Sequence, residues 1–114
     1  MAAGKYNIKV EQGATFILDF TIKTGSTPWN LTNYTARMQV RTSVNATTTL
    51  LSITNSDYIT LGGSAGTVAI SVPATVTDDL IAGRHVYDFE LVSSGGQVWR
   101  VLEGKFTVSP EVTR

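Results

Sequence analysis

The sequence predicts an all-β domain, an antiparallel β-sandwich of seven to eight strands with Greek-key connections. Three observations lead to this fold class. Short runs of alternating apolar and polar residues recur along the chain, and clusters of Gly, Ser, Asn and Pro separate them. No stretch carries the apolar periodicity of an amphipathic helix. A small barrel fits the same pattern and is the alternative fold.

Length and composition narrow the function classes. The 114 residues make one domain, 1–114, in which we expect residues 1–5 and 110–114 to be flexible tails. Lys+Arg and Asp+Glu number nine each, so no net field draws in nucleic acid or a membrane. The lack of cysteine favours a reducing compartment, and we expect neither a signal peptide nor a membrane span.

The first two strands are predicted over residues 6–10 and 14–23. The second shows the clearest alternation, with four large apolar side chains facing inward: Phe16, Leu18, Phe20 and Ile22. At about 1.5–3 kcal/mol for each buried side chain, these four contribute roughly 6–12 kcal/mol. A turn over residues 24–28 then ends the pattern with Gly25 and Pro28.

A polar-aromatic connector, residues 29–34, leads into a third strand over residues 35–42. Alternation in that strand places Arg37, Gln39 and Arg41 on the outer face. A polar loop follows over residues 43–48, and a shorter strand over 49–54.

The next segments are short and rich in turn formers. Strands at residues 58–61 and 67–72 flank a tight glycine turn, Gly62–Gly66, and Pro73 ends the second of them because it cannot donate to a ladder. Residues 74–80 predict a single helical turn with Thr75 as its N-cap.

The segment from residue 82 to residue 92 predicts the central strand. Four side chains share its inner face: His85, Tyr87, Phe89 and Leu91. Tyr87 follows Leu80 to Gly83 closely, which resembles the tyrosine corner of immunoglobulin-like sandwiches, so we expect its hydroxyl to bond the backbone just upstream.

A hairpin at residues 93–96 leads into the last strand, residues 97–109. The apolar phase of this strand switches along its length. The switch predicts either a β-bulge near Leu102 to Gly104 or one end buried on both sides.

No catalytic, metal or cofactor site is predicted. His85 is the single histidine, and alternation places it opposite Asp88 and Glu90, so these side chains do not converge. The adjacent Asp78 and Asp79 fit a solvated turn better than paired acid–base chemistry. The glycine turn lacks the lysine and the helix of a phosphate loop.

Two surfaces are candidates for binding. The outward side chains Arg37, Gln39 and Arg41 form a polar strip, with Arg84 and Arg100 as possible neighbours. Four aromatic residues offer either a sugar-stacking platform or simple packing of the core and loops: Trp29, Tyr34, Tyr58 and Trp99. We select Trp29, Tyr34, Arg37, Gln39 and Arg41 as partner-binding residues, together with an exposed sheet edge.

Four segments, in this order, resemble small proteins of tailed bacteriophages and the N-terminal immunoglobulin-like domain of phage upper baseplate proteins: residues 12–16, 31–41, 82–91 and 102–108. The most specific part is Leu31-Thr32-Asn33-Tyr34-Thr35-Ala36-Arg37-Met38-Gln39. The resemblance runs over nearly the whole chain and implies a structural role in the virion without catalysis. It supplies no map of functional residues.

We therefore expect a bacteriophage virion protein, made in the host cytoplasm, that acts as an adaptor or decoration domain at the tail, baseplate or fibre attachment. Its expected partners are other structural proteins in a symmetric, multi-copy assembly, with no cofactor, nucleic acid or membrane. The alternatives are a capsid decoration protein and a carbohydrate-binding module that recognises host surface glycan.

Overall fold

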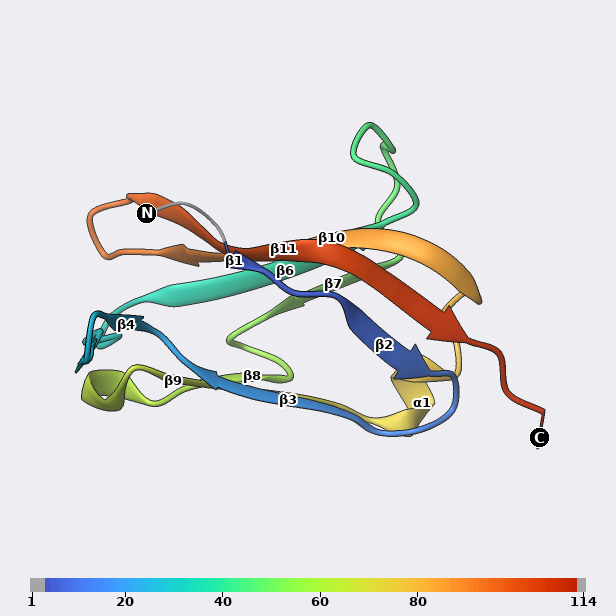
Figure 1. Cartoon of the computed structure of the whole chain (residues 1–114), viewed down its shortest axis with the longest axis horizontal. Helices are drawn as coiled ribbons and strands as arrows, with labels where there is room; N and C mark the ends of the chain where they lie inside the picture. The colour runs from blue at the N-terminus through green and yellow to red at the C-terminus, as the bar shows by residue number, and fades with distance from the viewer. Residues whose placement is uncertain (1–3, 113–114) are drawn as a thin grey trace.

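Two β-sheets packed face to face make up the computed structural model, which describes residues 4–112 (Figure 1). The larger sheet has the order β1-β11-β10-β6-β7, with β2 also paired to β11. Its strands are β1 (Gly4–Lys5), β2 (Ile8–Glu11), β6 (Thr35–Arg41), β7 (Leu51–Thr54), β10 (Gly83–Val92) and β11 (Val98–Ser109). The smaller sheet, in the order β3-β9-β8, contains β3 (Phe16–Thr21), β8 (Ile59–Leu61) and β9 (Thr67–Val72).

The remaining elements are short connectors. The hairpin of β4 (Lys23–Thr24) and β5 (Thr27–Pro28) closes one end of the sandwich, where a turn was predicted. A 3₁₀ turn, η1 (Gly63–Ala65), forms the glycine turn, and α1 (Ala74–Thr77) is the predicted helical turn. Pro73, not Thr75, occupies the N-cap of α1, and no side chain caps it. No helix in residues 4–112 has both the length and the apolar character needed to cross a membrane.

The predicted all-β, immunoglobulin-like sandwich is confirmed, and because the sheets are separate the barrel alternative is wrong. In immunoglobulin notation β3, β9 and β8 are strands B, E and D, and they face G, F, C and C′ (β11, β10, β6 and β7). The chain crosses between sheets from β3 to β6 and from β7 to β8, as Greek-key connections require (Figure 1).

The alternating pattern produces the core directly. Along β10 the four inner side chains are buried, and along β6 Ala36, Met38 and Val40 are buried. Aromatic rings join the two sheets: Phe20 of β3 lies edge-on to Phe89 of β10, with ring centroids 5.4 Å apart. An edge-on contact of this kind adds about 0.5–1.5 kcal/mol beyond the area that it buries.

The tyrosine-corner prediction is wrong in its partner. The Tyr87 hydroxyl donates to the Tyr6 carbonyl at 2.5 Å, 81 residues away in sequence, and not to the backbone just upstream. That upstream contact belongs to His85, whose Nε2 lies 2.7 Å from Ile81 O. Different residues make the two contacts because His85 lies next to the corner, whereas Tyr87 is two residues further along the strand and faces the N-terminal segment.

The N-terminal segment runs parallel to β11, along the edge opposite β10, and does not form the single strand predicted over residues 6–10. Parallel ladders join β1 to Leu102 and Glu103, and β2 to residues 106–109, with Tyr6 and Asn7 between them. A Cβ at Gly104 would collide with the Tyr6 carbonyl, so this close approach of the two segments requires glycine. Gly4 and Lys5, expected in a flexible tail, are therefore paired. Residues 1–3, 113 and 114 of the expected tails lie outside the described part of the chain.

The phase switch of the last strand is a β-bulge. Phe89 pairs with Leu102 and Glu90 pairs with Arg100, so Val101 has no partner in β10. The bulge lies one residue before the predicted site. Its extra residue places Glu103 and Lys105 on the outer face and Phe106 in the core.

Replacing Tyr87 with Phe should lower the free energy of unfolding at pH 7 by about 1 kcal/mol, because the Tyr6 carbonyl loses its donor. Burial, and to a smaller extent Tyr6, raises the pKa of Tyr87 to about 12 from 10.0. Because the pKa of Tyr87 is higher in the folded than in the unfolded protein, its contribution to the free energy of unfolding is fully present below pH 10.0. This contribution is lost as the pH rises towards 12.

Urea unfolding of both proteins at pH 7, and across the range from pH 10 to 12, measures this effect. The stability difference should shrink over the alkaline range. Tyr6→Phe is the control, because it keeps the backbone carbonyl that accepts from Tyr87 and removes only the smaller effect of the Tyr6 side chain on the pKa of Tyr87. Equal alkaline loss in wild type and Tyr87→Phe would contradict the assignment.

Candidate docking surface on the larger sheet

Charged side chains line the outer face of the larger sheet in rows that run across the strands. One row joins Arg37 of β6, Glu90 of β10 and Arg100 of β11. The next row contains Gln39, Asp88 and Glu103, and ends at Lys5 of β1. Side chains directly opposite one another on an antiparallel ladder have Cβ atoms about 4.5–5.5 Å apart, so each row is a continuous polar contact.

Ion pairs connect the first two rows. Arg37 Nε lies 2.7 Å from Glu90 Oε1, and Arg100 reaches both Asp88 and Glu103 at 3.5 Å. These groups are partly exposed, and such pairs typically stabilise a protein by 0 to about 1 kcal/mol each. Their main effect is to fix the positions of the side chains on the face.

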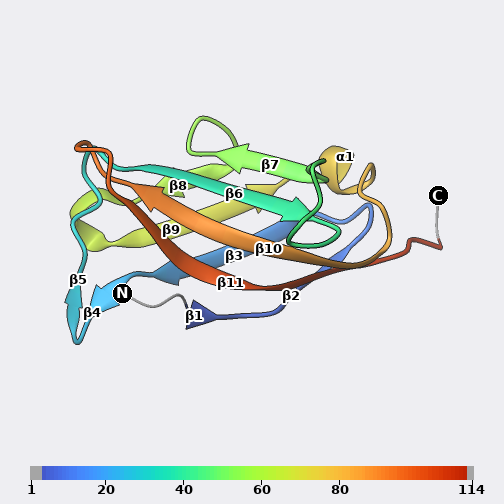
Figure 2. The same ribbon diagram turned by 90° about the horizontal axis from the view of Figure 1, so that it is seen from above.

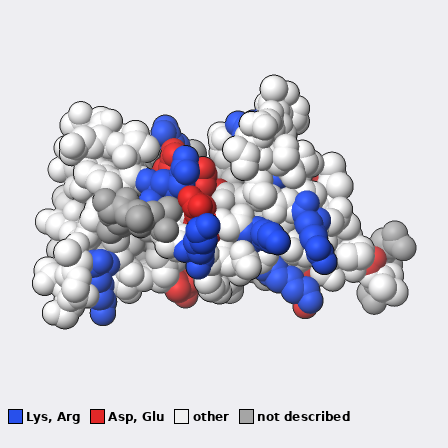
Figure 3. Space-filling model, turned by 45° about the horizontal axis from the view of Figure 1, so that its top comes forward, with Lys and Arg blue, Asp and Glu red and all other residues white. Residues whose placement is uncertain are grey.

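The following two rows hold basic side chains and no carboxylates. Arg41 and Lys105 flank Val86, and Arg84 and Lys9 flank Thr107. No salt bridge joins these four side chains to a carboxylate within residues 4–112. We call Lys9, Arg41, Arg84 and Lys105 the basic patch. Figure 3 shows basic side chains on this face beside a cluster of acidic ones.

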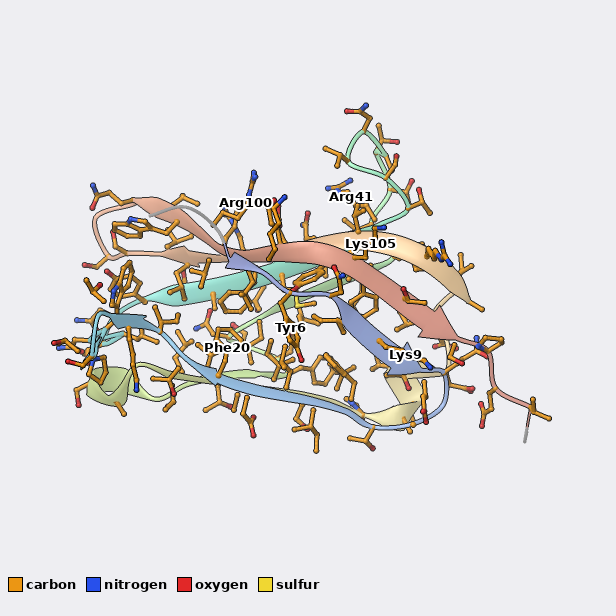
Figure 4. The ribbon with its side chains drawn as sticks, viewed as in Figure 1. Tyr6, Lys9, Phe20, Arg41, Arg100 and Lys105 are labelled. Carbon is orange, nitrogen blue, oxygen red and sulfur yellow. The ribbon has the colours of Figure 1, made fainter. Side chains whose placement is uncertain are left out.

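A groove of about 390 Å³ lies between the acidic row and the basic patch. Its floor is the sheet, and Ser43 and Val44 of the loop after β6 form one wall. Arg41 holds that loop in place, because its Nη1 donates to Ala46 O at 2.8 Å while its Nη2 donates to Gln39 Oε1 at 3.0 Å. Figure 4 shows Arg41, Lys105 and Arg100 along the same side of the ribbon.

Asp88 is the acid in this groove whose pKa is shifted. Burial raises its pKa above the ordinary 3.8, Glu90 and Glu103 raise it further, and Arg100 and Arg37 oppose the shift. The carboxylate is therefore incompletely compensated at neutral pH. A cation from a partner would find two carboxylates, Asp88 and Glu103, side by side on adjacent strands.

The five residues selected from the sequence do not form one surface. Arg37, Gln39 and Arg41 lie on the outer face of the sheet, as predicted, but Arg37 is neutralised by Glu90. Trp29 and Tyr34 belong instead to a half-buried aromatic cluster with Trp99 at one end of the sandwich.

The rings of this aromatic cluster pack against one another. The rings of Trp29 and Trp99 meet at 83° with centroids 5.7 Å apart, and Trp29 Nε1 donates to Thr24 Oγ1. Stacking on a sugar ring would need exposed, coplanar rings.

The other candidates from the sequence lie apart from the groove. His85 is buried near the start of β10, and Asp78 and Asp79 are exposed after α1. In residues 4–112 no group of three His, Cys, Asp or Glu side chains is arranged to hold a metal ion. What the face offers is a set of charges and a groove suited to binding by complementarity.

Sequence reasoning missed Glu103, Lys105 and Lys9 as members of this face. The bulge at Val101 decides the orientation of the first two, and the parallel pairing of β2 brings Lys9 beside Thr107. The switch of apolar phase in residues 97–109 was the signal for the bulge, but a shift of one residue reverses every side chain beyond it.

No protein-family model matches the sequence, and no curated protein matches it. Among solved structures, the chain is similar to CopC from Methylosinus trichosporium OB3b at 13% sequence identity. The match covers 94% of this chain and 89% of that one, with a TM-score of 0.49.

Replacing Asp88 with Asn should make the protein more stable at pH 7, because a carboxylate whose pKa is raised weakens the folded state when ionised. The gain should disappear as the pH falls below 3.8, where wild-type Asp88 is protonated in both states. Thermal melting across this pH range measures the difference.

Glu90→Gln is the contrasting variant, because it breaks the 2.7 Å pair with Arg37 and should cost up to about 1 kcal/mol. A lower melting temperature for Asp88→Asn at pH 7 would show that the pair with Arg100 outweighs burial.

Proposed function

We propose that this chain is a non-catalytic docking domain of a tailed-bacteriophage particle, an adaptor or decoration domain that joins larger structural proteins at the tail, baseplate or fibre attachment. The observation that carries the proposal is the outer face of the larger sheet, with its ordered charges and its groove. The resemblance of residues 31–41 and 82–91 to phage proteins supports the same reading, since both segments contribute strands to this face.

The mechanism is docking by electrostatic complementarity. The acidic row and the basic patch lie side by side, so a partner with the inverse arrangement fits in a single orientation. Complementary charges accelerate encounter and fix register more than they add to affinity, which suits an assembly that must place many copies identically. The loop after β6, anchored through Arg41, adds a raised wall that limits the direction of approach.

The test is to follow the protein into purified virions. An epitope-tagged copy supplied during infection should co-purify with particles through a density gradient. The variant Arg41→Glu/Lys105→Glu should be lost from particles by about tenfold or more, since reversing two docking charges costs at least about 1.4 kcal/mol of binding.

Thr60→Glu is the control, because it adds a negative charge to an exposed position on the outer face of the smaller sheet, opposite the uncharged Ala69. It should enter particles normally. Protein that remains in the lysate and never accompanies purified particles would refute the proposal.

A further inference from the structure

The smaller sheet ends in an edge strand, β3, that pairs with β9 on one side only. Within residues 4–112 the other sheet edges are shorter or interrupted. β7 has four residues, β8 has three, and the β1 and β2 edge is broken at Tyr6 and Asn7. β3 has six consecutive residues and no proline or bulge. Proteins usually shorten, charge or cover such edges, because an open edge pairs with any extended chain.

The direction of the backbone bonds shows which residues of β3 face outward along the edge. Ile22 N–H donates to Gly66 O, towards β9. Successive residues of a strand direct their N–H and C=O groups to opposite sides. Phe16, Leu18 and Phe20 therefore bond to β9, and the backbone groups of Ile17, Asp19 and Thr21 point along the open edge. These three residues present both donors and acceptors.

An apolar slot adjoins this edge. β1 and the chain leading to β2 extend beyond β3 in the opposite layer (Figure 2), leaving a cleft of about 510 Å³ between β1 and β3. Its apolar lining comes from both sheets: Leu18, Phe20, Ile22, Val101 and Leu102. Tyr6 and Phe20 both line the slot, and Figure 4 shows them between the two layers.

The charges at the slot are predominantly basic. Lys5 lines it from the larger sheet and Lys23 lines it just beyond the end of β3, whereas Asp19 is the one acid among its lining residues. Neither lysine belongs to a salt bridge within residues 4–112. An occupant that carries an acidic side chain would be paired with these lysines.

We propose that the open edge of β3 receives one extended segment of a neighbouring protein, added as a fourth strand of the smaller sheet. Apolar side chains at every second position of this segment fill the slot beneath β1, and an acidic side chain pairs with Lys5 or Lys23. This inference rests on the proposed docking function and gives the domain a second surface, distinct from the charged face. An adaptor that joins two proteins needs two such surfaces.

A second copy of this chain fits the edge less well. Antiparallel pairing of two β3 strands would bring the overhanging β1 of each copy over the β3 of the other, into the same space. A single strand from a different partner meets no such obstacle.

The experiment selects binders to the full chain from a displayed library of random short peptides. The selected peptides should alternate apolar residues and carry an acid, and in amide hydrogen exchange they should protect Ile17, Asp19 and Thr21. Thr21→Pro removes an N–H that faces the open edge and should weaken binding about tenfold. Thr21→Val keeps that N–H and the side-chain shape, and should bind as wild type does.

Lys23→Glu provides a variant that leaves the backbone intact. This variant should bind the acidic peptides severalfold more weakly than wild type does, while its melting temperature stays near that of wild type. A selection that yields no binder, peptides without alternation, or peptides that protect the β10–β11 face instead of β3 would overturn the inference. Dimers formed through β3 would also overturn it.

The two proposals fail separately. Thr21→Pro protein that binds no peptide yet enters virions leaves the charged face as the docking surface. If the protein binds peptides at β3 but is missing from virions, the proposed phage role is refuted and the inference about the strand-accepting edge stands.

Discussion

The position of β10 between β6 and β11 is the constraint on which the rest of the structure depends. Its inner side chains make up the centre of the core, and Phe89 in particular joins the two sheets through Phe20. The residues that alternate with them point outward, so the ladder that builds the core also fixes the positions of the charged rows. A one-residue shift in register would expose Phe89 and bury Glu90 together.

Two polar contacts hold this central strand, one to a distant part of the chain and one to the adjacent corner. Tyr87 reaches the N-terminal segment, and His85 reaches the corner at Ile81. The hydroxyl of Tyr87 satisfies a carbonyl in the gap between β1 and β2, where no strand partner is available for it. The N-terminal segment is thereby fastened alongside β11 although its ladder is interrupted, and Gly104 provides the space for their close approach.

The domain presents two surfaces of different chemistry. The outer face of the larger sheet carries charged rows, a groove and the loop fixed by Arg41, whereas the β3 edge offers backbone groups beside an apolar slot. In the proposed docking function, the first surface would select a partner by its charge pattern, and the second by its ability to extend. Faces, edges and loops are the parts of a small sandwich that a partner can reach.

The sequence by itself determined the fold class, the outward orientation of Arg37, Gln39 and Arg41, and six of the strands to within one or two residues: β3, β6, β7, β8, β9 and β10. These features follow from local alternation and turn residues, which act over a few positions. Only the tertiary structure decided the partner of Tyr87, the parallel pairing of β2 with β11, and the ion pairs that neutralise Arg37 and Arg100. Each of these depends on residues far apart in the chain, and the bulge at Val101 sets their register. Local alternation carries no information about which distant strand will lie alongside, because that choice is made by packing the two layers together.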